Sequence, residues 1–143
     1  MRLESREPTN ESGFYACLRE RTLSRIFYER IEPADESGFP DIYFVMRNSM
    51  IPCEGTIELK FAETELPNLK ALCRGTQKAA LLDYHQAGGR RRFALCYSKG
   101  DVFLWDTNAY FNALRVEGLL GFKRISLADP SFCPWLCQWL GNS

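Results

Sequence analysis

Residues 38–60 read GFPDIYFVMRNSMIPCEGTIELK. Two apolar runs separated by a turn predict strands at 41–46 and 56–61, because β-branched and aromatic residues dominate both runs. Side chains alternate between the two faces of a strand, so Glu58 and Lys60 share one face. Charged side chains in so apolar a strand cost free energy unless they are paired or bind a metal ion.

Asp41 opens the first predicted strand, directly after a proline. If the two strands are neighbours, Asp41, Glu58 and Lys60 converge at one edge of the sheet. Two carboxylates and an ammonium in one place indicate a site for a divalent metal ion with a cation beside it. The alternative is an exposed charge pair, which is how an isolated Glu-x-Lys on a strand usually behaves.

The rest of the chain alternates helical and strand patterns. The predicted elements are one helix or two short ones at 11–30, a helix at 67–87 with Gly75 as a candidate break, strands at 92–97, 102–105 and 123–125, a helix from 107 to 114, and an apolar tail at 132–140 that packs on the core or forms a subunit contact. This order predicts an α/β fold with a central mixed sheet flanked by helices. We expect a single domain over 1–143, with a core at about 11–106 and a C-terminal extension at 107–143.

Length and composition are those of an ordinary globular domain. The chain has 143 residues, of which 45% are hydrophobic, and its 18 basic and 18 acidic residues give a formal net charge of zero. No apolar run approaches the roughly 20 residues of a membrane-spanning helix, and no signal peptide precedes the first helix, so we expect a cytoplasmic protein and no membrane partner. The six cysteines are scattered and are expected to be free thiols.

Several short segments together carry a family resemblance. In order they are RIE at 30–32, GFPD at 38–41, IELK at 57–60, TQ at 76–77 and AGG at 87–89. The Pro-Asp and Glu-x-Lys pair resembles the signature of the PD-(D/E)XK nuclease superfamily. The complete ordered set resembles its phage-type VRR-NUC branch, close to the Holliday-junction resolvases, over most of the chain.

The resemblance implies a restriction-endonuclease-like domain with an αβββαβ core, and it implies roles for five residues. Asp41 and Glu58 would hold Mg²⁺ or Mn²⁺ together with the main-chain carbonyl of Leu59, a ligand set that suits these ions. Lys60 would position a water molecule and stabilise charge on the phosphate. Gln77 would face the site from the following helix; its alternative is a solvated helix residue.

A second metal ion would need another carboxylate. Glu32 is the first candidate, and Glu11 or Glu20 on the leading helix comes next. The sequence does not choose between them.

Basic residues outside this set are candidates for contacts with the phosphate backbone of a nucleic acid. They are Arg90, Arg91 and Arg92 with Lys99 nearby, and a stripe of Lys70, Arg74 and Lys78 at helical spacing. The alternative for both groups is an ordinary solvated surface.

The expected function is a metal-dependent DNA endonuclease acting on branched or otherwise structured DNA, and the resemblance implies a phage or bacterial host cytosol as its location. A four-way junction needs two symmetrical cuts, so that substrate implies a homodimer. A non-catalytic module of the same fold, holding nucleic acid or a protein, is the alternative. An enzyme acting on RNA is a third possibility. Nothing in the chain reads a 2′-hydroxyl, so the sequence does not decide between RNA and DNA.

Overall fold

A six-stranded mixed sheet forms the centre of the structure, a computed structural model that describes residues 7–31, 40–119 and 121–141. Its strands, in spatial as well as chain order, are β1 (Ile26–Arg30), β2 (Ile42–Met46), β3 (Glu54–Ala62), β4 (Arg92–Ser98), β5 (Asp101–Trp105) and β6 (Lys123–Ser126). Only β3 and β4 run parallel; the other neighbouring pairs of these strands are antiparallel. The predicted mixed sheet with flanking helices is confirmed.

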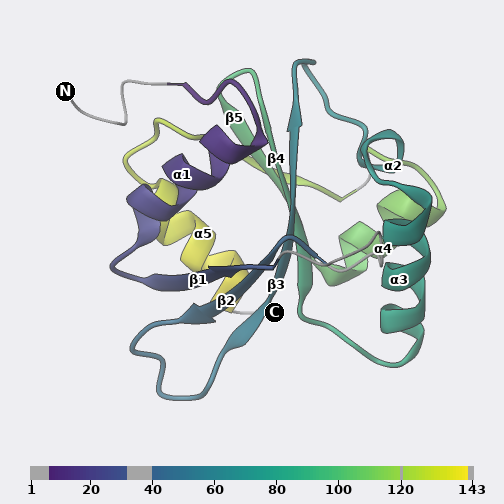
Figure 1. Cartoon of the computed structure of the whole chain (residues 1–143), viewed down its shortest axis with the longest axis horizontal. Helices are drawn as coiled ribbons and strands as arrows, with labels where there is room; N and C mark the ends of the chain where they lie inside the picture. Colours follow the sequence, from purple (N-terminus) through teal and green to yellow (C-terminus); the bar gives the residue numbers. More distant parts are fainter. Residues whose placement is uncertain (1–6, 32–39, 120, 142–143) are drawn as a thin grey trace.

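Helices cover both faces of this sheet (Figure 1). They are α1 (Glu11–Thr22), α2 (Leu69–Leu72), α3 (Gly75–Gln86), α4 (Thr107–Arg115) and α5 (Phe132–Gly141). A parallel strand pair needs a crossover connection, and α2 and α3 lie within the crossover from β3 to β4. In the described part of the chain, no helix is long and apolar enough to span a membrane.

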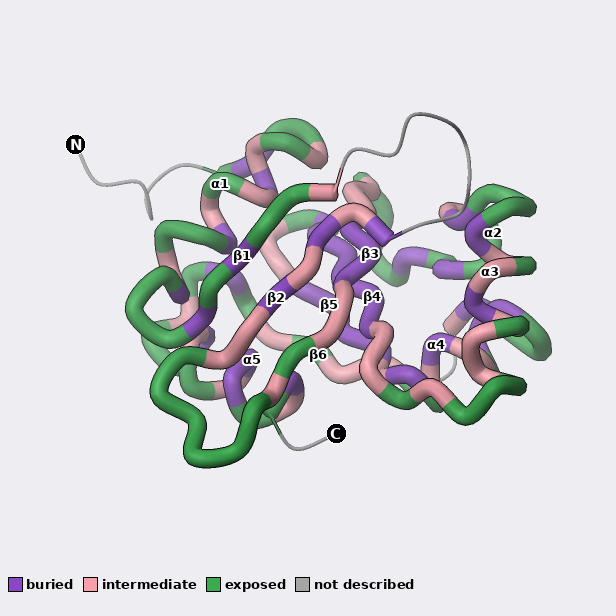
Figure 2. The backbone as a smooth tube through the Cα atoms, turned by 60° about the horizontal axis from the view of Figure 1, so that its bottom comes forward, coloured by how far each residue is buried: buried purple, intermediate pink, exposed green. Residues whose placement is uncertain are grey.

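The central strands are apolar on both sides because each face packs against its own layer of helices. Ile57 and Leu59 of β3 lie in the core beneath α1 and α5, and both are fully buried. The opposite face packs against α2, α3 and α4, where Trp105 and Leu81 are buried. Figure 2 shows the contrast between β4, which is buried along nearly its whole length, and the edge strand β1, where buried and exposed residues alternate. Glu58 and Lys60 therefore point toward the α3 layer, as the alternation of side chains requires.

The predicted helix at 11–30 is wrong in its second half. α1 ends at Thr22, whose hydroxyl donates to the carbonyl of Leu18 at 2.8 Å and lies 2.7 Å from the hydroxyl of Tyr28. The chain then turns and enters β1, where Ile26 and Tyr28 are buried and the residues between and after them are exposed. Burial of every second residue is typical of a strand, and pairing with β2 stabilises β1.

The predicted helix at 67–87 is divided into two helices, and α3 begins at Gly75, the candidate break. Cys73 and Arg74, which separate α2 from α3, both have extended backbone, with ψ of 139° and 161°. Lys70 therefore lies on α2 while Lys78 lies on α3, so the predicted basic stripe does not run along a single helix.

The apolar tail is a helix that packs on the core, which is the first of the two expected outcomes. Leu136 and Leu140 of α5 are fully buried. The guanidinium of Arg91 donates to the carbonyl oxygen of Leu140 at 2.6 Å, where cations are favourable because the carbonyls of a helix C-terminus carry partial negative charge. Arg91 thus links the end of α5 to the start of β4.

Substitution of Gly55 tests how closely β3 packs against its neighbours. A Cβ added at Gly55 would lie 2.4 Å from the carbonyl oxygen of Arg91, whereas one at Gly75 would meet nothing within 4 Å. We expect Gly55→Ala to lower the free energy of unfolding by roughly 1–3 kcal/mol. Gly75→Ala, the control, should leave it unchanged or raise it by up to about 1 kcal/mol. Urea unfolding measures both, and equal effects would contradict this account of the packing.

Candidate active site

Asp41 and Glu58 meet where β2 begins. Ile42 pairs with Ile57, so in the described part of the chain β3 continues past this point without a strand beside it on the β2 side. Asp41 takes the place of that missing partner: its Oδ2 accepts a hydrogen bond from the backbone N–H of Leu59 at 2.8 Å. The carboxylate is therefore held by main chain at the sheet edge.

The carbonyl of Leu59 points toward the same side. The N–H of Thr56 donates to the carbonyl of Arg91 at 2.9 Å, toward β4. Backbone groups of successive strand residues point to opposite sides, so those of Thr56 and Leu59, three positions apart, point to different neighbours. Since the N–H of Leu59 faces Asp41, its carbonyl does so as well.

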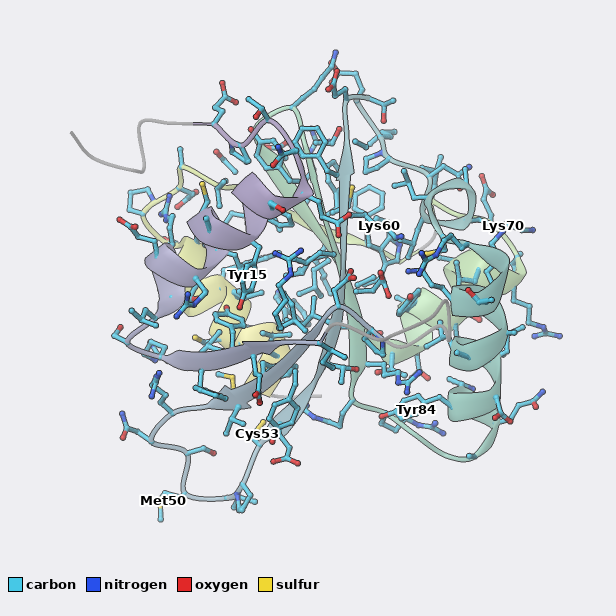
Figure 3. The ribbon with its side chains drawn as sticks, viewed as in Figure 1. Tyr15, Met50, Cys53, Lys60, Lys70 and Tyr84 are labelled. Carbon is cyan, nitrogen blue, oxygen red and sulfur yellow. The ribbon has the colours of Figure 1, made fainter. Side chains whose placement is uncertain are left out.

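Gln77 joins the lysine and the glutamate of the site. Its Nε2 donates to Oε2 of Glu58 at 2.7 Å, and its Oε1 accepts from Nζ of Lys60 at 3.0 Å. The same Oε1 accepts from the backbone N–H of Arg74 at 2.9 Å, as the third residue of a capping box at the start of α3. Helix α3 therefore positions both strand side chains, and Lys60 lies in the space between β3 and this helix (Figure 3).

Glu58 is a buried acid, with only 3% of its side chain exposed, and Lys60 lies 3.7 Å away with 12% exposed. Burial first, and then the hydrogen bond and the negative charge of Asp41, raise the pKa of Glu58 to about 9, although the charge of Lys60 acts to lower it. Near neutral pH, in the absence of a bound cation, Glu58 is therefore protonated. The raised pKa favours a proton on Glu58 beside Asp41, and a bound metal ion would replace that proton.

Glu11 approaches this pair from the first turn of α1. Burial raises the pKa of Glu11, and the charge of Asp41 adds to the increase, while Lys60, Arg30 and Arg74 lower it. The charge of Glu11 therefore interacts with the charges of Asp41 and Lys60 in the site.

Glu20 has a different position on the same helix. It is exposed and borders a shallow surface hollow lined by Tyr15, Ala16, Arg19 and Leu23. Of the two candidates on the first helix, Glu11 is thus the one that faces the site. Glu32 lies outside the described residues.

The donor atoms fit a magnesium or manganese ion that keeps several of its waters. Carboxylates of Asp41 and Glu58 and the carbonyl of Leu59 are hard oxygen ligands on one side of the sheet edge. Within residues 7–31, 40–119 and 121–141, no group of three or more His, Cys, Asp or Glu side chains is gathered closely enough to hold a metal ion. A substrate phosphate and water would have to complete the coordination.

The predicted basic residues divide into separate groups. Arg74 is exposed at the start of α3, and Lys78 is half-buried one turn later. Arg90 is exposed, Arg91 is engaged with the end of α5, and Arg92 lies with its guanidinium carbon 4.4 Å from the centre of the Tyr84 ring.

Lys99 does not lie beside the arginines. β4 separates it from them, and a strand of this length holds its ends about 20 Å apart. Lys99 pairs instead with Glu65 at 3.6 Å, in an exposed position.

Arg30 is a cation of the site that the sequence reasoning missed. It pairs with Ile42, next to Asp41 in the chain, and its guanidinium carbon lies 4.9 Å from the centre of the Tyr15 ring. Its charge also lowers the pKa of Glu11. The position follows from the pairing of β1 with β2, so the strand pattern at 26–30 was the signal that would have revealed it.

Comparison with solved structures shows a likeness of fold. The chain is similar to the Holliday junction resolvase Hjc of the archaeal hyperthermophile Archaeoglobus fulgidus, with a TM-score of 0.48 and 13% identity over 87% of this chain and 92% of that one. No protein-family model and no curated protein matches the sequence. A likeness at this level of identity leaves the activity and the roles of residues to be argued from the site itself.

The raised pKa of Glu58 predicts a pH-dependent stability. Because the folded-state pKa lies above the ordinary value of 4.5, the contribution of Glu58 to stability is complete below pH 4.5 and is lost as the pH rises toward 9. In EDTA, the wild-type free energy of unfolding should fall relative to Glu58→Gln by at most about 1.4 kcal/mol per pH unit across this window. Urea unfolding between these pH values measures the difference.

The matched control is Glu20→Gln, which removes an exposed acid and should follow the wild-type pH profile. Added Mg²⁺ should restore stability at alkaline pH to the wild type but not to Glu58→Gln. Parallel pH profiles of wild type and Glu58→Gln would contradict the assignment of Glu58 as a buried, protonated acid.

Proposed function

We propose that this protein is a Mg²⁺- or Mn²⁺-dependent endodeoxyribonuclease. The observation that carries the proposal is the linkage of Glu58 and Lys60 through Gln77, with Asp41 held beside them by the backbone of β3. Burying an acid and a lysine of a central strand beside a second acid costs free energy, and a functional requirement for these groups accounts for that cost. They are the parts that phosphodiester hydrolysis requires.

Each residue has a separate task in this proposal. A divalent ion held by Asp41, Glu58 and the carbonyl of Leu59 would polarise the phosphate and lower the pKa of a bound water. Lys60, which is nearly buried, would donate to a phosphate oxygen or to the attacking water and so stabilise the charge that develops. Gln77 holds Lys60 and Glu58 in a fixed relative position, which makes it a positioning residue.

Among the acids in the described part of the chain, Glu11 is the best placed for a second ion or for orienting the water. Its charge interacts with Asp41 and Lys60, whereas Glu20 is remote from them in the exposed part of α1. We assign Glu11 this supporting role within the proposed site.

Branched DNA is the proposed substrate, and the sequence resemblance to the Holliday-junction resolvases supports it. Arg30 and Arg74 provide positive charge around the acids, where phosphates would approach. Symmetrical cleavage of a four-way junction would require two copies of the site, so we propose a homodimer for that substrate.

A non-catalytic DNA-binding module is the second candidate. It is favoured by the lack, among the described residues, of a cluster of three or more metal-ligating side chains. Calorimetry with Mn²⁺ distinguishes the two: the module would bind DNA without taking up the ion, whereas the nuclease would take it up through Asp41 and Glu58.

The activity predicts the effect of two substitutions. Asp41→Asn and Lys60→Met should each reduce Mg²⁺-dependent nicking by about 10²-fold or more, because they remove a metal ligand and the positive charge at the phosphate. Cleavage of labelled single-stranded, duplex, flap and four-way-junction DNAs measures the loss, and circular dichroism checks that the variants remain folded.

Glu20→Gln is the control and should cleave at the wild-type rate. The site assignment fails if the folded Lys60→Met protein cuts as fast as the wild type. The proposed activity fails if the wild type cuts none of these DNAs with either ion.

A further inference from the structure

The hairpin between β2 and β3 ends in an apolar tip that the proposed chemistry does not use. Met50 is fully exposed and Ile51 is 77% exposed, which makes them the two most exposed large hydrophobic residues of the described chain. Figure 3 shows Met50 at the far end of the hairpin, away from the body of the protein and from Lys60. Two such side chains in water carry an unfavourable free energy that a partner would remove.

Local hydrogen bonds hold this tip, which we define as residues 47–53, in an outward conformation. The N–H of Met46 donates to the carbonyl of Cys53 at 2.9 Å and closes the base of the loop. Asn48 has a φ of 59°, and the hydroxyl of Ser49 donates to the carbonyl of Ile51 at 2.5 Å. The apolar side chains are therefore presented by an ordered turn.

Positive charge flanks the tip on both sides. Arg47 is exposed and its N–H donates to the carbonyl of Arg25, which is also exposed. On the other side the guanidinium of Arg91 contacts Sγ of Cys53 at 2.9 Å. The segment 47–53 contains no acidic residue, and the exposed Glu54 that follows it accepts a hydrogen bond from the hydroxyl of Tyr43 at 2.8 Å. An apolar end between arginines is complementary to a polyanion that also offers an apolar surface.

DNA with an opened base stack has both properties. Phosphates supply the negative charge, and the faces of unpaired bases accept apolar side chains such as Met and Ile, which act as wedges in other DNA-bending proteins. The open hollow beside the tip, about 530 Å³ in volume, is lined by Met50, Pro52 and Arg91 among others and has room for a displaced base.

The tip lies at a useful distance from the proposed cleavage site, because the same two strands carry both. Glu58 is four residues from Glu54, the first residue of β3, which corresponds to about 13 Å of strand. With the loop added, the tip lies on the order of 20 Å from the acids, or about six base pairs of B-DNA at 3.4 Å each. One DNA arm can thus reach both places.

We propose that Met50 and Ile51 form a wedge that inserts into the base stack at a branch point of DNA and gives the protein its preference for branched over continuous duplexes. This inference rests on the proposed function, because it assigns a substrate-selecting element to the same enzyme. It assigns no catalytic step to the tip.

The test is DNA binding by the double variant Met50→Ser/Ile51→Ser. Measurements are made in an Asp41→Asn background, so that the DNA stays intact, with a four-way junction or fork carrying 2-aminopurine at the branch. The unsubstituted tip should increase 2-aminopurine fluorescence severalfold, and the double variant should lose this increase. The ratio of branched-DNA to duplex affinity should fall about tenfold, a change of about 1.4 kcal/mol in binding free energy.

Val116→Ser is the matched control, because Val116 is 61% exposed at the end of α4, on the other side of the sheet. It should leave both the fluorescence and the affinity ratio unchanged. The wedge is overturned if the double variant keeps the fluorescence increase, if it loses duplex and branched affinity equally, or if the tip instead governs self-association in sedimentation or binding to anionic vesicles.

Failure of the wedge and failure of the nuclease are distinguishable. Tip-dependent unstacking by a wild type that cuts no DNA supports the wedge and refutes the enzyme. Cleavage that is equally selective with and without the tip residues supports the enzyme and refutes the wedge.

Discussion

Glu58 imposes the constraint on which the rest of the site depends, because a carboxyl buried on a central strand must be compensated by its neighbours. Its compensation comes from Gln77 at 2.7 Å, from Lys60 at 3.7 Å and from a proton favoured by the contact with Asp41. Removal of any of these leaves the carboxyl group of Glu58 poorly paired in a region of low polarity. The site therefore ties together β2, β3 and α3 as much as it gathers reactive groups.

The sheet topology explains why those three elements meet. β3 and β4 are parallel, so the chain must cross over between them, and α3 lies on this crossover against the face that carries Glu58 and Lys60. β2 is shorter than β3 and begins beside Ile57, which leaves the next part of β3 open to Asp41. Strand length and crossover together create an edge where acids, lysine and substrate can meet.

Local signals in the sequence predicted much of this arrangement. The strands around Asp41 and Glu58 and the turn at Lys99 and Gly100, which have φ of 50° and 89°, follow from short-range patterns of apolar and turn residues. The meeting of Asp41, Glu58, Lys60 and Gln77 could be anticipated from alternation in the strands and from the family resemblance.

Features that depend on tertiary packing were beyond such patterns. β1 forms because β2 pairs with it. The helical spacing of apolar residues in α1 extends as far as Ile26, so the sequence pattern did not mark the change from helix to strand. The choice of Glu11 over Glu20 depends on the rotation of α1 against the sheet, and the structural use of Arg91 depends on the far end of the chain at α5. The residues that make each of these contacts lie far apart in the sequence, so short-range patterns do not reveal them.

The central claim is that Asp41 and Glu58 form a cation site in which a metal ion replaces a proton. Titration with Mn²⁺ by calorimetry at pH 7, in buffers that differ in ionisation enthalpy, measures the ion and the proton together. The account predicts binding with release of close to one proton per ion, with the release declining as the pH passes 9, where Glu58 is already ionised. Absence of Mn²⁺ binding, or binding without proton release at pH 7, would contradict it.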